Sequence, residues 1–358
     1  MKKVVAVPAN DTFAALGLML DVLDGSVAGF VTPPEINGVR PEVSVPTEAT
    51  DDVGLIVESS GSTGVPKRIE LSPAALKHSG DAALARLGGP GQWLLALPVN
   101  FIAGANVLIR SVLSDTQPVM LNTRMPFTAE AFVRGAALMD GARRYTSVVP
   151  AQLAKLAQAA EEDAFSFSML RKFDAILVGG QAPNWADVFS LRSKGVNVVV
   201  SYGMTETGGG CIFDGEALDG VDLRISGGLI EISGATLANG IGPWFKTNDL
   251  GEIRDGRLEV LGRADRVMIS GGLKLALDRV EELALQIPGV ESIVAVALQS
   301  EWGESVGIVY SGSSEVSFER LTELGPAAKV ARAVLVSQIP RLPSGKPDLL
   351  VCQKLLAD

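Results

Sequence analysis

A segment rich in glycine and hydroxyl residues, ending in a lysine, is the strongest chemical signal in the sequence. It reads Ser-Ser-Gly-Ser-Thr-Gly-Val-Pro-Lys over residues 59–67 and directly follows the apolar run Leu55–Val57. Glycines let a backbone approach an anion closely, hydroxyl groups add donors, and a lysine supplies positive charge. The combination favours a loop that binds a triphosphate. It is not a Walker loop, because Lys67 precedes Arg68 rather than a hydroxyl residue. A Ser/Gly-rich hairpin is the alternative.

A threonine beside a glutamate marks a second segment. Residues 201–206 read Ser-Tyr-Gly-Met-Thr-Glu and follow the apolar run Val196–Val200, which predicts a strand. Ligands of open α/β sheets bind at the carboxyl ends of the strands. Thr205 and Glu206 are therefore placed where they can hold phosphate and Mg²⁺. An ordinary turn after a strand is the alternative interpretation.

Together the two segments resemble motifs of the adenylate-forming superfamily, which includes acyl-CoA synthetases, adenylation domains and luciferases. Three further stretches are similar to its motifs and follow in the same order. Residues 245–251 look like its Thr-Gly-Asp segment with Asn248 in place of glycine, residues 262–266 like its hinge motif, and residues 342–346 like its C-terminal lysine loop. Five motifs in family order make coincidence a poor explanation.

The resemblance implies a role for each matching residue of the nucleotide site. The β- and γ-phosphates would be bound by the loop residues Ser59, Ser60, Gly61, Ser62, Thr63, Gly64 and Lys67. Thr205 would contact phosphate oxygens and Glu206 would bind Mg²⁺. Tyr202 would lie along the adenine, and the backbone of Gly179, Gly180 and Gln181 would flank it; Gly203 and Met204 would also belong to the cofactor-binding site.

The remaining motifs would serve the ribose, the reacting carboxylate and the thiol. Asp249 would accept hydrogen bonds from the ribose hydroxyls, and Arg263 would reach the ribose or a phosphate. Lys346 would bridge the attacking carboxylate and the α-phosphate, where two anions meet and cations must neutralise both. The small domain would turn at the hinge residue Asp265, bringing Gly271 and Gly272 to the pantetheine channel; a surface turn is the alternative for these glycines. The expected small molecules are ATP, Mg²⁺ and coenzyme A as co-substrate.

Within the superfamily, the chain is most similar to the o-succinylbenzoate-CoA ligases of menaquinone biosynthesis, especially their short actinobacterial forms. Residues 147–153, 202–215 and 218–221 carry this likeness. Where the family often has a histidine in the acyl pocket, this chain has Asn100 and Phe101. An aromatic dicarboxylate needs a cation near that pocket, and Arg110 is a candidate; a surface arginine is the alternative.

Other functions stay open at this point. The enzyme could act on another aryl or acyl group, or load a carrier protein. A non-catalytic nucleotide-binding protein is disfavoured, because Lys346, Glu206 and Asp249 all match positions that the chemistry needs. A kinase or P-loop ATPase is disfavoured, because this sequence lacks the motifs of both classes; such an enzyme would release ADP. A single histidine, His78, is too few for a Ser-His-Asp or metal-histidine mechanism.

The composition excludes several classes of binding partner and favours one cellular compartment. A net charge of -10 argues against nucleic acid and anionic membranes. Cys211 and Cys352, the only cysteines, form neither a disulfide framework nor a metal cluster. No apolar run approaches the roughly 20 residues of a membrane span. We expect a cytoplasmic protein, with a homodimer as one option for its assembly.

The elements that must position these residues read as α/β. Short apolar runs alternate with amphipathic ones between about residues 50 and 201, which predicts mixed, mostly parallel sheets covered by helices. A β-rich segment follows, with a hairpin turn at Asp255-Gly256. We expect a large N-terminal domain over residues 1–263 and a small, mobile α+β domain over residues 264–358. In the latter, Asp278 and Glu281 fit the cap and third position of a helix.

Overall fold

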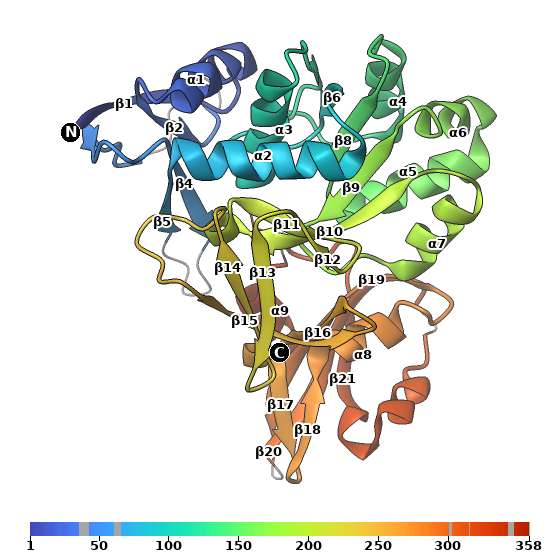
Figure 1. Ribbon diagram of the computed structural model, residues 1–358. Helices are drawn as coiled ribbons and strands as arrows, with labels where there is room; N and C mark the ends of the chain where they lie inside the picture. Colours follow the sequence, from blue (N-terminus) through green and yellow to red (C-terminus); the bar gives the residue numbers. More distant parts are fainter. Residues whose placement is uncertain (36–42, 61–65, 301–302, 315, 343–346, 358) are drawn as a thin grey trace. The chain divides into compact units, whose positions relative to one another are not determined.

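The computed structural model describes residues 1–35, 43–60, 66–300, 303–314, 316–342 and 347–357. The contacts divide the chain into two compact units, drawn in Figure 1: unit 1 is Met1–Leu223 with Ile232–Phe245, and unit 2 is Arg224–Glu231 with Lys246–Asp358. Helices and sheets alternate through unit 1, so the predicted mixed α/β class is confirmed. A functional boundary near Arg263 and a mobile small domain stay predictions.

The first sheet of unit 1 carries the predicted phosphate loop at one edge. Its strand order is β3-β1-β2-β4-β5; β1, β2 and β4 run parallel, whereas β3 and β5 pair antiparallel with β1 and β4. The bounds are β1 Lys2–Pro8, β2 Ala28–Thr32, β3 Glu48–Ala49, β4 Leu55–Ser60 and β5 Pro66–Leu71.

The second sheet of unit 1 has the order β12-β11-β10-β9-β8-β6-β7, with parallel strands from β10 to β7. The antiparallel β11 and β12 extend one edge. Strand β9 is a continuous apolar run, as expected of a parallel strand covered on both faces. The bounds are β6 Gln92–Leu95, β7 Val119–Met120, β8 Arg144–Val148, β9 Ala175–Gly179, β10 Val198–Met204, β11 Gly209–Phe213 and β12 Glu216–Ala217.

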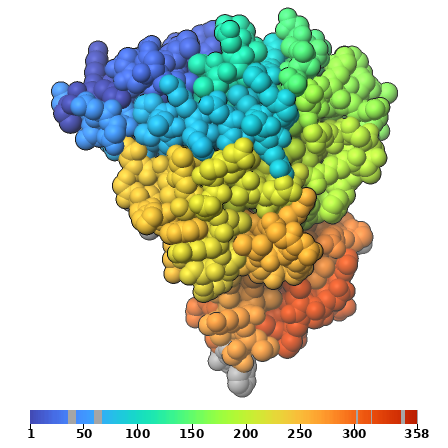
Figure 2. Space-filling view, in the orientation of Figure 1, coloured from blue at the N-terminus to red at the C-terminus, as the bar shows by residue number. Residues whose placement is uncertain are grey.

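Helices α1, α2 and α3 lie between these two sheets. Helix α1 packs on β1 and β2 and also on α3, while α3 packs on β6, β8 and β11. Helix α2 lies on the face that Figure 2 shows. It begins after Ser72, whose hydroxyl accepts from Ala75 N, and ends at Gly88 with φ 102°. The bounds are α1 Thr12–Asp24, α2 Pro73–Leu87 and α3 Ile102–Leu113.

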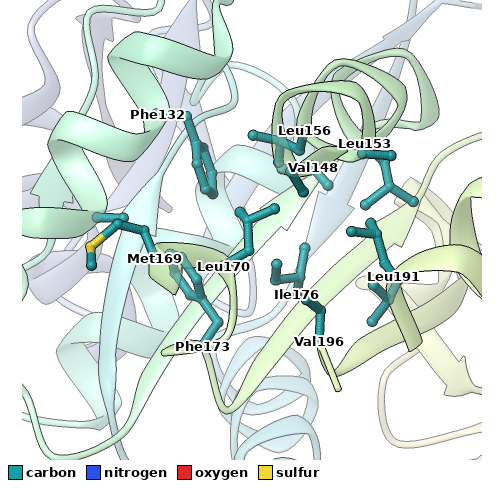
Figure 3. Close-up of a cluster of buried hydrophobic side chains, with 14 of the residues drawn as sticks. Phe132, Val148, Leu153, Leu156, Met169, Leu170, Phe173, Ile176, Leu191 and Val196 are labelled. Atoms are coloured by element: carbon teal, nitrogen blue, oxygen red, sulfur yellow. The ribbon is translucent and has the colours of Figure 1, made fainter. Parts of the chain in front are cut away.

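The opposite face of the second sheet is covered by α4, α5, α6 and α7. Figure 3 shows the apolar side chains that fill this layer, with Phe132 of α4, Leu156 of α5 and Leu170 of α6 close to Ile176 of β9. All four are fully buried. This core fixes β9 and β10, whose carboxyl ends carry predicted site residues. The bounds are α4 Ala129–Ala137, α5 Pro150–Glu162, α6 Ala164–Leu170 and α7 Trp185–Ser193.

Unit 2 combines two antiparallel arrangements of strands with short helices. One sheet has the order β13-β14-β15-β16, and the other has the order β18-β17-β20-β19 with β21 parallel to β20. The predicted turn at Asp255-Gly256 is confirmed, because Arg254 pairs with Arg257 across it. The bounds are β13 Val221–Ser226, β14 Leu229–Gly234, β15 Phe245–Arg254, β16 Arg257–Arg263, β17 Val267–Ser270, β18 Leu273–Ala276, β19 Val290–Ser300, β20 Gly303–Gly312, β21 Val330–Leu335, α8 Leu277–Ala284 and α9 Leu349–Ala357.

The predicted cap of helix α8 is wrong. The cap residue is Ala276, which makes no side-chain cap hydrogen bond, and Asp278 lies inside the first turn. Its carboxylate instead accepts a hydrogen bond from Arg263 N at 2.7 Å and pairs with Arg266. Glu281 bonds Ala295 N rather than the start of its own helix. Asp278 and Glu281 therefore bind residues distant in the sequence rather than the backbone at the start of their own helix.

Candidate active site

The predicted phosphate loop joins two antiparallel strands. Ser59 pairs with Lys67 at the end of β4 and β5, and the Ser59 hydroxyl donates to Lys67 O at 3.3 Å. A hairpin is thus present, and it brings both ends of the glycine-rich segment together. Gly61, Ser62, Thr63 and Gly64 lie outside the described residues, as does the side chain of Ser60. The phosphate-binding role of the segment stays a prediction.

Strand β10 is longer than its apolar run indicates. It extends to Met204, because its last residues pair antiparallel with β11. Its parallel pairing with β9 ends where Ser201 lies opposite Gly179. A Cβ at Gly179 would come within 2.6 Å of Ser201 O, and Gly180 has φ 82°, so both positions favour glycine. The half-buried Gln181 follows them. The predicted adenine residues of both strands therefore meet at one edge of the sheet.

A tight turn holds Thr205 and Glu206 at the end of β10. The turn is a 3₁₀ helix, Thr205–Thr207, that ends at Gly208 with φ 66°. Thr207 Oγ1 accepts from Met204 N at 3.0 Å and lies 2.8 Å from Gly209 O, to which it can donate. At Gly203, a Cβ would come within 2.1 Å of Gly209 O. The strand and its return are therefore packed backbone against backbone.

Two buried side chains that the sequence analysis did not single out hold the far side of this turn. Asn106 Nδ2 of α3 donates to Gly208 O at 2.8 Å, and Ser79 Oγ of α2 donates to the same oxygen at 3.3 Å. Both residues are at most 2% exposed. Each is a polar residue on an otherwise apolar helix face. This pattern could have indicated them in the sequence, because buried polar groups need hydrogen-bond partners.

The glutamate of this turn faces the lysine of the hairpin. Lys67 Nζ and Glu206 Oε1 are 3.9 Å apart, and the Lys67 side chain is 66% exposed. An exposed pair at this distance is weak, so phosphate oxygens can replace the carboxylate as partners of the lysine. Ala238 N donates to Glu206 O at 2.9 Å, and Asn239 N donates to Glu70 O of β5 at 2.8 Å. This short segment fastens the turn to the hairpin.

The residues near Lys67 fit a magnesium ion bound together with a nucleotide. Across the residues that the structure describes, no group of three or more His, Cys, Asp or Glu side chains could hold a metal. Mg²⁺ commonly binds through one or two carboxylates plus substrate phosphates. Glu206, whose side chain is 18% exposed beside two hydroxyl residues, suits that requirement. A surface hollow of about 540 Å³ lies next to the turn, lined by Asp52, Leu237 and Asn239 among others, but Glu206 does not line it.

The predicted ribose residues face one another in unit 2. Asp249 of β15 pairs with Arg263 of β16, and their side chains lie 3.5 Å apart. Arg263 also makes two bonds to Asp265, at 2.8 and 2.6 Å. These contacts raise the pKa of the Arg263 guanidinium and lower the pKa of the Asp265 carboxyl. Thr247 Oγ1 accepts from Asp249 N at 3.0 Å and so fixes its backbone.

The two glycines assigned to the thioester step lie elsewhere in unit 2. Gly271 and Gly272 form the turn of the β17–β18 hairpin, with φ 56° and 82°. Two successive positive angles are the geometry of a tight hairpin turn and account for both glycines. Lys346 lies outside the described residues. Its role, and that of the hairpin toward pantetheine, stay predictions.

The acyl-pocket candidates lie at the two ends of α3. Asn100 and Phe101 form the turn before the helix, and Asn100 Oδ1 is buried without a hydrogen-bond partner. Arg110 is not a surface residue, since it is only 3% exposed. Its guanidinium lies 5.2 Å from the ring centre of Trp93, and its Nε has no partner. Burial lowers the pKa of Arg110 to about 10, so the side chain stays charged at neutral pH.

His78 and Cys211 have structural surroundings. His78 Nε2 is 2.9 Å from Asp219 O, in a contact between α2 and the turn before β13. Cys211 is fully buried in β11. Burial raises the pKa of the Cys211 thiol to about 11. A group this far from ionisation at neutral pH does not act as a nucleophile.

Both cysteines are expected to resist alkylation in the folded protein. Cys211 and Cys352 are buried, and burial raises the pKa of both thiols. At pH 7.5, iodoacetamide should leave the native protein unmodified and should label both thiols after unfolding in guanidinium chloride. Intact mass measures the result. Fast labelling of the native chain would show that a thiol is accessible.

The fold and the sheet-edge motifs define an α/β protein of the nucleotide-binding class. The chain belongs to the family of AMP-binding enzymes, whose model matches residues 8–230. A Mycobacterium tuberculosis protein named probable 2-succinylbenzoate–CoA ligase is 39% identical over 356 residues, covering 94% of this chain and 91% of that protein. The 2-succinylbenzoate–CoA ligase of Bacillus licheniformis is 30% identical over 339 residues, covering 83% and 69%.

Solved structures have the same fold. The o-succinylbenzoate-CoA synthetase of Bacillus subtilis, in complex with the acyl-adenylate intermediate OSB-AMP, superposes with a TM-score of 0.74 at 21% identity and covers 96% of this chain and 82% of that chain. The amide bond synthetase McbA of Marinactinospora thermotolerans superposes with a TM-score of 0.77 at 19% identity, covering 99% and 89%. No helix in the described part of this chain has the length and hydropathy needed to cross a bilayer.

Proposed function

We propose that this chain is a ligase that joins 2-succinylbenzoate to coenzyme A at the expense of ATP, in menaquinone biosynthesis. AMP and pyrophosphate are the other products. The observation that carries the catalytic class is the 3.9 Å approach of Lys67 to Glu206, which brings together two motif segments from the two different sheets of unit 1. The acid is supported by the relatives named 2-succinylbenzoate–CoA ligase. The reaction takes place in the cytoplasm.

In the first half-reaction, a carboxylate oxygen of the acid attacks the α-phosphorus of ATP and pyrophosphate leaves. Lys67 and the hydroxyls of its loop bind the β- and γ-phosphates, and Lys346 neutralises the approaching carboxylate. Glu206 would hold Mg²⁺, which would supply charge neutralisation for the leaving pyrophosphate. Asp249 binds the ribose, and Arg263 binds the ribose or a phosphate. Water competes with the carboxylate for the α-phosphorus. Close positioning of the carboxylate and the α-phosphate therefore favours formation of the adenylate.

In the second half-reaction, the thiol of coenzyme A loses its proton to solvent and its sulfur attacks the carbonyl carbon of the adenylate; the bond from that carbon to the phosphate oxygen breaks and AMP leaves. The small domain turns at Asp265 between the two steps, and the Gly271-Gly272 turn then approaches the pantetheine arm. Glycine residues leave space for a narrow chain. This arrangement uses one nucleotide site for both steps.

The products of ATP distinguish this reaction from its competitors. Purified protein is incubated with ATP, Mg²⁺, coenzyme A and 2-succinylbenzoate, and the nucleotides are separated by chromatography. AMP with pyrophosphate supports the ligase. ADP with inorganic phosphate would indicate a kinase or ATPase, and unchanged ATP would favour a nucleotide-binding protein without catalysis.

The second carboxylate of 2-succinylbenzoate suits the cluster around Arg110. Asn106 lies one helical turn before Arg110, so both share a face of α3, and Asn106 is bonded to the turn after Glu206. Trp93 Nε1, Asn106 Oδ1 and Arg110 Nε are all buried without hydrogen-bond partners. Buried polar atoms normally have partners, so the donors Trp93 Nε1 and Arg110 Nε suit a bound anion, whereas the acceptor Asn106 Oδ1 suits a water molecule. A dicarboxylate supplies the anion.

Arg110→Met is expected to raise the KM for 2-succinylbenzoate by about tenfold or more, because it removes a charged partner. The KM for ATP should change less than twofold. Thermal stability should not fall, since the change removes an unpaired buried charge at similar volume. Arg134→Met, on the exposed face of α4, is the control. An equal rise of both KM values, or a loss of stability with unchanged KM, would assign Arg110 a structural role.

A further inference from the structure

One carboxylate holds both ends of the predicted hinge. Asp278 Oδ2 accepts a hydrogen bond from Arg263 N at 2.7 Å, and Asp278 Oδ1 lies 2.7 Å from Arg266 Nε. The backbone passes so close that a Cβ at Gly262 would lie 2.7 Å from Asp278 Oδ2. The hinge segment, residues 263–266, is therefore closed into a loop across the first turn of α8.

The C-terminal end of the hinge segment is anchored further. The Arg266 guanidinium pairs with Glu281 of α8 and donates to Ala295 O of β19 at 3.1 Å. Glu281 accepts from Ala295 N at 2.7 Å, and the Arg266 side chain is only 15% exposed. Arg266 thus moves with α8 and β19 rather than with the strand before it.

The middle of the segment has a different environment. The Asp265 side chain is 45% exposed, and Arg263 binds both of its carboxylate oxygens. Arg263 is also the neighbour of Asp249 across the β15–β16 pair. Because both ends of the hinge segment are held and its centre is exposed, we expect any change of backbone dihedral angles to occur around Asp265.

We propose that Asp278 is a positioning residue that latches the hinge in one of the two domain arrangements, an inference that rests on the proposed two-step function. Rotation about Asp265 changes the distance between Arg263 N and Arg266 Nε. A single carboxylate cannot keep both partners at 2.7 Å through that change. At least one charge-assisted contact therefore breaks in the other arrangement. Such a contact is worth about tenfold or more in the equilibrium between arrangements.

The test separates the two half-reactions in Asp278→Asn and Asp278→Ser. Adenylation is measured as pyrophosphate release without coenzyme A, and thioester formation is measured from supplied acyl-adenylate. We expect the ratio of the two rates to shift by about tenfold or more in both variants. The matched control is Glu282→Gln, because Glu282 pairs with Arg279 on the same helix; its ratio should stay within twofold.

An unchanged ratio, or an equal fall of both rates, would overturn the latch. Wild-type protein that performs neither half-reaction would instead overturn the proposed function, so the two failures are distinct. Hydrogen–deuterium exchange tests the contact without relying on activity. Peptides that contain residues 263–266 should exchange faster in Asp278→Ser, because the shorter side chain no longer brings an acceptor to the Arg263 amide. Equal exchange in wild type and variant would also reject the latch.

Discussion

Replacing Lys346 by alanine should lower pyrophosphate release by at least about a hundredfold, while supplied acyl-adenylate is still converted to the thioester. The reason is electrostatic. In adenylation a carboxylate approaches an α-phosphate, so a cation is needed between the two anions. In the second step no two anions have to approach each other in this way, because AMP leaves as its bond to the carbonyl carbon breaks. The measurement uses single-turnover pyrophosphate release and, separately, the mass of the thioester.

Lys354→Ala is the matched control for Lys346→Ala. Lys354 is an exposed lysine of α9, in the same C-terminal part of the chain. It should leave both half-reactions within twofold of wild type. If Lys346→Ala reduced both half-reactions equally, the lysine would not be specific to adenylation, and the two-state use of the small domain would lose its main support.

Glu206→Gln should also reduce adenylation by at least about a hundredfold at fixed Mg²⁺. The carboxylate is the metal-binding group proposed for this site, and an amide oxygen carries no net charge for a divalent cation. The Mg²⁺ concentration that gives half-maximal pyrophosphate release should rise by about tenfold or more. The turn itself should persist, because the Glu206 backbone oxygen, rather than its side chain, accepts from Ala238 N.

The control for Glu206→Gln is Glu130→Gln, which removes a carboxylate from an exposed ion pair with Arg134 on α4. Its Mg²⁺ dependence should match wild type. A Glu206→Gln variant with normal Mg²⁺ dependence but reduced stability would show that the carboxylate supports the fold, through its approach to Lys67, rather than the metal.

The candidate site could be predicted from the sequence because the residue types that bind phosphate lie close together in the chain. Glycines, hydroxyls and a lysine predict a phosphate loop at residues 59–67, and the structure brings Lys67 of the first sheet close to Glu206 after a strand of the second sheet. The extent of β10 was missed, since its last residues pair through the backbone with β11 and carry no apolar run. Asn106 and Ser79 were missed because their partner, Gly208 O, lies more than 100 positions away.

The wrong cap of α8 and the burial of Arg110 have a common physical cause. Asp278 and Glu281 match a capping pattern, but Arg263 and Arg266 compete for both carboxylates once unit 2 is folded. Arg110 is of a residue type that is mostly exposed, yet it is buried against Trp93. In each case a tertiary partner decided the outcome, and local spacing carries no information about such partners.

The most direct test of the proposed ligase activity and of its substrate is thioester formation from a panel of acids. Purified protein is incubated with ATP, Mg²⁺ and coenzyme A, together with 2-succinylbenzoate, benzoate, a fatty acid or no acid, and the thioester is identified by mass. We expect a thioester, with equimolar AMP and pyrophosphate, from 2-succinylbenzoate alone. A thioester from another acid in its place would contradict the assigned substrate, and no thioester or pyrophosphate from any acid would contradict the assignment as a ligase.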